Sequence, residues 1–190
     1  MTPLRLLAAA VLTASLLPSA AFAEEEAVSI DDFLGQPRSY TVEEIGSDLA
    51  YGFCPLFLAG QFALDAPQLA ERGFGSTIDK APHPKYGEIS IVTVERDDGR
   101  VAFGGAPGKI CMVIIDGPQR DAALGALRER MSWTGLDFKP TEDITAPLPE
   151  THVETFKAPT DGQFLYVQLT QSLSVTANPL VTAQLFAMES

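Results

Sequence analysis

The chain holds two cysteines, Cys54 and Cys111, and two histidines, His83 and His152. A thiolate beside an imidazole forms a Cys/His nucleophile, which also needs a third group to orient the ring. Neither cysteine lies in a local sequence typical of such enzymes, and both histidines are isolated, so they are expected to be solvated surface side chains. The competing interpretation is a structural disulfide, and the redox compartment decides between the two.

The first 23 residues predict an exported protein. A basic residue precedes the apolar run 6–17, which is too short to span a bilayer as a permanent helix, and a small-x-small site ends at Ala23. We therefore expect cleavage between Ala23 and Glu24 and a periplasmic or secreted location. In that oxidising compartment Cys54 and Cys111 are expected to form a disulfide, contributing about 4 kcal/mol in the chain-entropy model.

The other common chemical motifs are incomplete. The stretch 104–109 has the Gly-Lys of a phosphate-binding loop, but Phe103 replaces the first required glycine and Ile110 replaces the hydroxyl residue after the lysine. No G-x-S-x-G nucleophile elbow occurs, and the histidines lack the close spacing of a metal site. We therefore predict no catalytic residue, no metal site and no cofactor.

The composition restricts the possible partners. With 190 residues, the chain is long enough for one domain with its own core. A net charge of −12 repels phosphate backbones and anionic lipid headgroups, so we expect neither nucleic-acid binding nor a stable membrane anchor. An acidic surface also keeps an exported protein in solution, which by itself accounts for the charge.

Helices are expected near the start and in the middle of the mature part of the chain. Residues 24–40 form an acidic lead-in, and Thr41 with Glu44 fits a capping box that opens an amphipathic helix. Pro55 is expected to kink or restart that helix. A short helix should begin with Asp65 as its cap and end at Gly73, and a longer one should cover residues 119–131.

Six strands are expected, in two groups of three. The β-branched and apolar runs that predict them are residues 88–95, 101–103, 109–115, 151–157, 162–171 and 180–187. The run 109–115 is apolar throughout, which favours a central strand buried on both faces. The expected fold is α+β, with an antiparallel sheet from two three-stranded meanders and helices packed on one face. Its domain organisation is a signal peptide (1–23), the lead-in (24–40) and a single domain (41–190).

Three residues are the candidates for a binding surface: Trp133, His83 and Phe138. Core packing is the favoured interpretation of Trp133, because tryptophan is usually largely buried. The alternative is a partly exposed ring that anchors a ligand or partner, because Trp133 follows a helix and precedes a long loop at 134–150. We predict a non-catalytic binding or interaction module of the cell envelope, whose partner is an envelope protein or a small ligand. The alternatives are an envelope hydrolase or thiol enzyme whose site is assembled in space, and a structural subunit of an envelope complex.

Overall fold

The computed structural model describes residues 40–144, 150–172 and 180–189. The expected signal peptide and nearly all of the acidic lead-in lie outside these residues. The helical elements are α2 (Val42–Asp48), η1 (Leu49–Phe53), α3 (Cys54–Leu58), α4 (Pro67–Ala70), α5 (Arg120–Arg130) and η2 (Met131–Thr134). The strands are β1 (Asp79–His83), β2 (Gly87–Arg96), β3 (Gly99–Ala106), β4 (Ile110–Asp116), β5 (Lys139–Pro140), β6 (Thr151–Thr160), β7 (Gln163–Ser172) and β8 (Leu180–Glu189).

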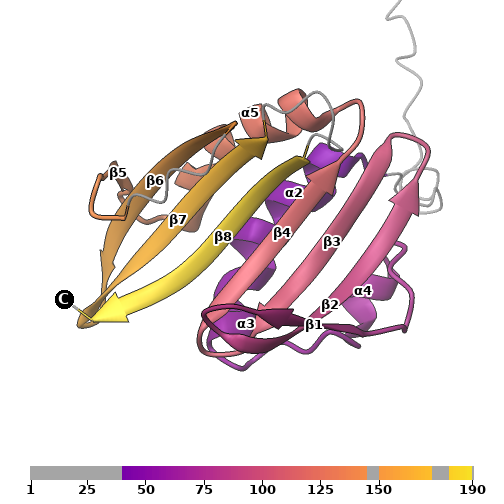
Figure 1. The fold of residues 1–190 in the computed structure, drawn as a ribbon, viewed down its shortest axis with the longest axis horizontal. Helices are drawn as coiled ribbons and strands as arrows, with labels where there is room; N and C mark the ends of the chain where they lie inside the picture. Colours follow the sequence, from indigo (N-terminus) through magenta and orange to yellow (C-terminus); the bar gives the residue numbers. More distant parts are fainter. Residues whose placement is uncertain (1–39, 145–149, 173–179, 190) are drawn as a thin grey trace, which may run out of the picture. The chain divides into compact units, whose positions relative to one another are not determined.

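One antiparallel sheet of eight strands organises the fold, in the order β1-β2-β3-β4-β8-β7-β6-β5 (Figure 1). The α+β class is confirmed, but the two three-stranded meanders are wrong. Each half is a four-stranded meander, and the halves join where β4 pairs with β8. The prediction that the run 109–115 forms a central strand is correct, because β4 has three strands on one side and four on the other in this order.

The two strands missed from the sequence are the edges of the sheet. Strand β1 carries Pro82 and pairs only with β2, and β5 has two residues, ends in Pro140 and pairs only with β6. Proline lacks a backbone donor and is tolerated at an edge, where one side of the strand needs no ladder hydrogen bond. Both strands therefore form because they pair with a neighbouring strand, and their own sequences do not predict them. Strand β5 also interrupts the region expected to be a long surface loop.

The first helix begins as its sequence predicts. The hydroxyl of Thr41 accepts a hydrogen bond from the Glu44 backbone, and the Glu44 carboxylate accepts one from Thr41, which completes the capping box. The backbone N–H of Val42 also donates to the Asp98 carboxylate at 3.0 Å, so the hairpin between β2 and β3 holds the start of the helix.

Pro55 alters this helix without stopping it. The backbone N–H of Cys54 donates to the carbonyl of Leu49, five residues earlier, so η1 is a π-helical turn directly before the proline. Because proline has no N–H to donate, the widened turn lets the chain continue into α3. The short helix α4 begins later than predicted, since Ala66 and not Asp65 occupies its cap position, with no side-chain cap hydrogen bond.

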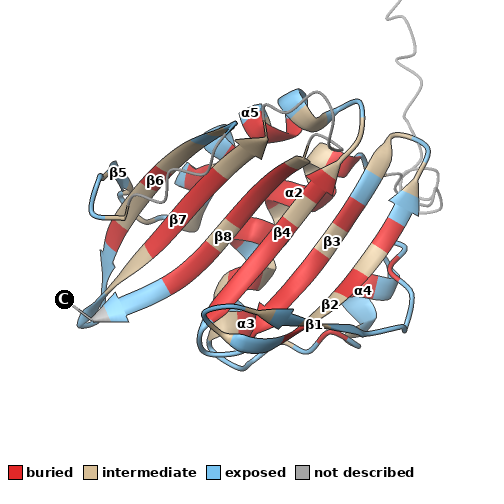
Figure 2. Cartoon of the chain, in the orientation of Figure 1, coloured by how far each residue is buried: buried red, intermediate tan, exposed pale blue. Residues whose placement is uncertain are grey.

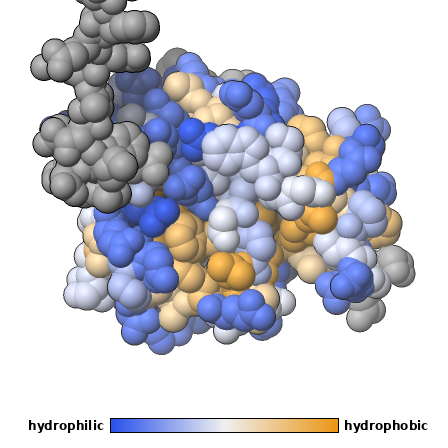
Figure 3. All heavy atoms as spheres, turned by 180° about the vertical axis from the view of Figure 1, so that it is seen from behind, coloured by the Kyte–Doolittle hydropathy of each residue, from blue (hydrophilic) through white to orange (hydrophobic). Residues whose placement is uncertain are grey.

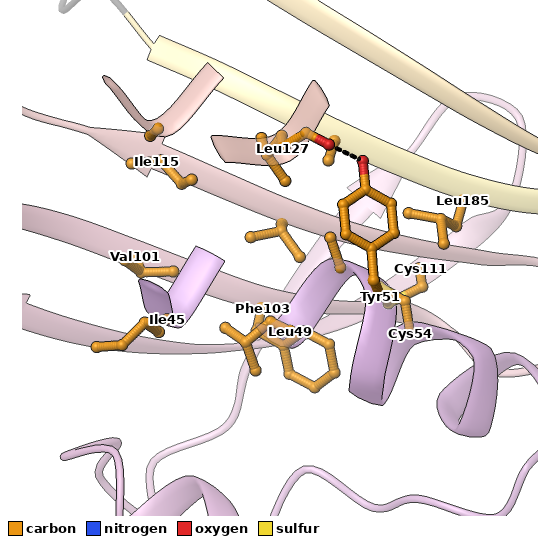
Figure 4. Packing of buried hydrophobic residues seen from close by; sticks show 14 of the residues in the cluster. Ile45, Leu49, Tyr51, Cys54, Val101, Phe103, Cys111, Ile115, Leu127 and Leu185 are labelled. Atoms are coloured by element: carbon orange, nitrogen blue, oxygen red, sulfur yellow. Dashed lines mark hydrogen bonds between the residues drawn. A yellow bond between two sulfur atoms is a disulfide. The ribbon is translucent and has the colours of Figure 1, made fainter. Parts of the chain in front are cut away.

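The main core lies between the sheet and the helices on one of its faces (Figure 2). Ile45 and Leu49 from the first helix, Phe57 from α3 and Leu127 from α5 are all almost fully buried against the sheet. The Cys54–Cys111 disulfide joins α3 to β4 inside this core, with both residues fully buried, as Figure 4 shows, and confirms the predicted pairing.

A second, smaller apolar cluster lies on the opposite face, which carries no described helix. Ile89, Ala106, Ile110 and Met112 are its buried members, and Tyr86 packs against them. Lys85, beside Tyr86 in the turn between β1 and β2, lies 5.9 Å from the ring centre of Phe186 on β8. The tip of this hairpin therefore bends over the helix-free face and covers part of it.

Candidate functional site

An apolar hollow lies where α5 ends beside β6, and we call it the α5–β6 groove. Its cavity volume is about 450 Å³. The lining residues are Arg128, Met131, Ser132, Leu136, Asp137, Phe138 and Phe156. Figure 3 views the helix-bearing side of the molecule, where hydrophobic surface forms several separate patches, one of them toward the β5 side of the sheet. The size and apolar lining are those of a site for large side chains or a small ligand.

The groove is shaped by the way the chain leaves α5. The helix tightens into η2, and Gly135 then adopts a left-handed conformation with φ 72° that ends it. The Thr134 hydroxyl donates to the carbonyl of Met131 and accepts from the backbone of Leu136, so both sides of this turn are fixed. The turn directs the chain back toward β6, where Phe138 and Phe156 pack against the edge of the main core.

Trp133 follows Ser132 in the chain, does not itself line the groove, and is exposed. Its relative exposure is 69 %, so the expectation that this ring packs in the core is wrong. The guanidinium of Arg130 covers the ring at 4.7 Å from its centre. Arg130 is itself held, because it donates to the Ser47 hydroxyl at 2.6 Å and lies 3.9 Å from the Asp48 carboxylate. The exposed Trp133 ring therefore packs on a guanidinium that is itself held by α2.

A compact set of charges borders the groove on the β6 side. Arg128 donates two hydrogen bonds to the Glu154 carboxylate, at 2.9 and 2.6 Å, and the His152 ring lies 2.8 Å from the same carboxylate. The hydrogen bond from Arg128, with a smaller contribution from His152, lowers the pKa of Glu154 below its usual range. The pKa of Arg128 is raised by the same hydrogen bond. Glu154 thus stays ionised, and the charge of Arg128 is neutralised locally.

A second hollow adjoins the groove. Its volume is about 490 Å³, and Phe156 lines both hollows. Its other lining residues are Pro140, Thr141, Glu142, Val153, Glu154 and Thr155. The second hollow is lined by residues of β5 and β6, and Phe156 is the lining residue that it shares with the groove.

Of the three residues singled out from the sequence, only Phe138 lines the groove. Trp133 follows Ser132, which also lines it. His83 lies on β1, at the other edge of the sheet. Its Nδ1 accepts hydrogen bonds from the backbone of Lys85 and Tyr86, and its ring packs on Tyr86 at 4.9 Å, so it orders the hairpin tip.

Sequence reasoning missed Met131, Leu136 and Phe156 as members of the groove. Met131 and Phe156 fall on a predicted helix and a predicted strand, where an apolar residue is normally assigned to the core. Their one distinguishing signal is position. Met131 ends the predicted helix, and Leu136 follows the glycine that turns the chain.

The cysteine chemistry is settled by the fold. No described cysteine is free, so neither Cys54 nor Cys111 offers a thiolate while the disulfide is intact. The Cys/His hypothesis requires such a thiolate. Among residues 40–144, 150–172 and 180–189, no group of three or more His, Cys, Asp or Glu side chains is placed to hold a metal ion.

Comparison with protein-family models, with curated proteins and with solved structures finds no match to this chain. The fold itself defines an α+β protein with one eight-stranded antiparallel sheet. None of the described helices has the length and apolar character needed to cross a membrane.

Proposed function

We propose that this chain is an exported protein of the cell envelope that binds a partner through the α5–β6 groove and does no chemistry there. Export is supported by the signal sequence together with the Cys54–Cys111 disulfide, since such bonds persist in oxidising compartments. The partner is a protein segment or a small ligand that inserts large apolar groups between Phe138 and Phe156.

The observation that carries the binding role is the exposed Trp133, which directly follows Ser132 in the lining of an apolar hollow. Aromatic anchors next to a pocket are the residues that supply most of the binding energy in protein interfaces. A ring that is 69 % exposed contributes little to the core, while its cation contact with Arg130 keeps it in one place. The ring is therefore presented in a form that loses little conformational freedom when a partner binds.

The binding role is tested by Phe138→Ala in a pull-down from the envelope fraction of the native host. The groove loses its aromatic wall, and partners retained by the unaltered protein should be lost. Ile78→Ala is the matched control, because Ile78 is an exposed apolar residue directly before β1, at the opposite edge of the sheet. If both variants retain the same partners, or both lose them, the groove is not the binding surface. Thermal unfolding of each variant verifies that it is folded.

Export is tested separately by the intact mass of the protein recovered from the envelope, with thiols alkylated before and after reduction. Cleavage between Ala23 and Glu24 with no alkylation until reduction is the expected result. A mass that retains the first 23 residues, or cysteines alkylated without reduction, would contradict export or the disulfide respectively.

A further inference from the structure

We propose that the partner segment carries Lys or Arg beside a large apolar side chain, so that the α5–β6 groove binds basic–apolar peptide segments. This inference rests on the proposed binding role and specifies the chemistry of its partner. It follows from which charges around the groove are already satisfied and which are free.

The arginines at the groove are occupied. Arg128 is neutralised by two hydrogen bonds to Glu154, and Arg130 is held by Ser47 and Asp48 while it covers Trp133. An anionic partner would have to replace these contacts, and would meet the negative charge of the whole chain as well.

The acids near the groove are available instead. Glu129 is exposed, precedes Ser132 by one helical turn, and makes no side-chain hydrogen bond or ion pair with any described residue. Asp137 lines the groove and, among the described residues, forms its ion pair with Lys139; both of these side chains are more than two thirds exposed. Such an exposed pair is worth little and is easily exchanged. Glu142, which is exposed, lines the adjoining hollow.

Trp133 adds a second attraction for cations. Arg130 already lies over one face of the ring at 4.7 Å, and the large exposure of the side chain leaves another face open to solvent. The negative face of an indole attracts a lysine or arginine that is placed over it. A segment with an apolar side chain between Phe138 and Phe156 can therefore set a neighbouring cation on the ring or beside Glu129.

The charges also argue against a second copy of this chain as the occupant. A copy would bring another net charge of −12 to a surface that already displays Glu129, Asp137 and Glu142. Like charges brought together across an interface oppose association. A basic segment has the opposite effect, because the overall field of the protein draws it to the surface.

Three short synthetic peptides test the proposal. Each has the same phenylalanine and leucine, separated by lysine in the first, glutamate in the second and glutamine in the third. Trp133 is the single tryptophan of the chain and follows the lining residue Ser132, so its fluorescence reports binding at this end of α5, and anisotropy of a dye on each peptide gives an independent reading. We expect the lysine peptide to bind about tenfold tighter than the glutamate peptide at low salt.

Salt and charge variants identify the cause. Raising the ionic strength from about 0.01 M to about 1 M shortens the screening length from about 30 Å to about 3 Å, which should remove most of the preference. Combining Glu129→Gln with Asp137→Asn should weaken the lysine peptide about fivefold more than it weakens the glutamine peptide. Glu71→Gln, an exposed acid at the end of α4, is the matched control and should change neither.

The outcomes separate this inference from the binding role. Equal binding of all three peptides, abolished by Phe138→Ala, would overturn the basic preference and leave the groove as a binding site. Tighter binding of the glutamate peptide would overturn it as well. If no peptide changes the Trp133 fluorescence or gains anisotropy, both the inference and the groove's binding role are refuted for peptide segments.

Discussion

Removing the Cys54–Cys111 disulfide should lower the free energy of unfolding by about 4 kcal/mol. The bond joins positions that are 57 residues apart, and the chain-entropy model converts a loop of that length to this value. The loss is large compared with the total stability of a domain, about 5–15 kcal/mol. The variant to make is Cys54→Ala with Cys111→Ala, because alanine avoids placing an unpaired hydroxyl in a fully buried site.

Urea unfolding measured with and without reductant gives the test. The unaltered protein in reductant should approach the stability of the double variant, and the variant itself should not respond to reductant. The slope of the free energy against urea should rise when the bond is absent, because the unfolded chain exposes more surface. Since both sulfur atoms are inside the core, reduction should be slow under native conditions and should accelerate in urea. A stability change below about 1 kcal/mol would refute the loop-closure reasoning.

Three further predictions concern single side chains. Tyr51→Phe should lower the unfolding free energy by about 1 kcal/mol in urea titrations, because the buried hydroxyl donates to the α5 backbone at 2.6 Å. Burial also raises the pKa of Tyr51. The stability that the neutral side chain adds is therefore present below its unfolded pKa of about 10 and is lost as the pH rises above that value. The Phe variant should lose less stability than the unaltered protein at alkaline pH. Gly104→Ala should cost well over about 2 kcal/mol in the same titration, because φ is 154° and the new Cβ would lie 2.0 Å from the Ser90 carbonyl oxygen. Glu154→Gln should reduce the loss of thermal stability on acidification. The pKa of Glu154 is lowered mainly by its hydrogen bond from Arg128. The stability that ionised Glu154 adds is therefore present above its unfolded pKa of about 4.3 and is lost as the pH falls through the lower folded value.

The elements with strong local signals could be predicted from the sequence. The capping box at Thr41 fixes its own geometry and appears as expected. Strands β4 and β7 follow from β-branched and apolar runs that suit buried positions. The disulfide followed from the compartment and from the apolar surroundings of both cysteines, with no knowledge of their distance.

The remaining elements depend on contacts that the sequence does not display. Strand β5 exists because two residues meet β6, and its second residue, Pro140, reads locally as a loop. The π-helical turn before Pro55 lets the helix continue into α3 while it packs against the sheet, and the sequence does not display that packing. The joining of both meanders into one sheet depends on β4 and β8 exposing matching edges to each other, a contact between distant parts of the chain.

The site shows most clearly why composition alone was insufficient. Trp133 was expected in the core because tryptophan has so much apolar surface, and burying that surface would stabilise the fold by about 25 cal/mol for each Å². Instead, Gly135 turns the chain one residue after η2, and Arg130 holds the ring in water. A partner that covers the exposed part of this ring would gain the same stabilisation. The groove, whose lining begins on the same stretch of chain at Met131 and Ser132, offers further apolar surface to that partner. One partner covering both would therefore account for the two apolar features that the core leaves unburied.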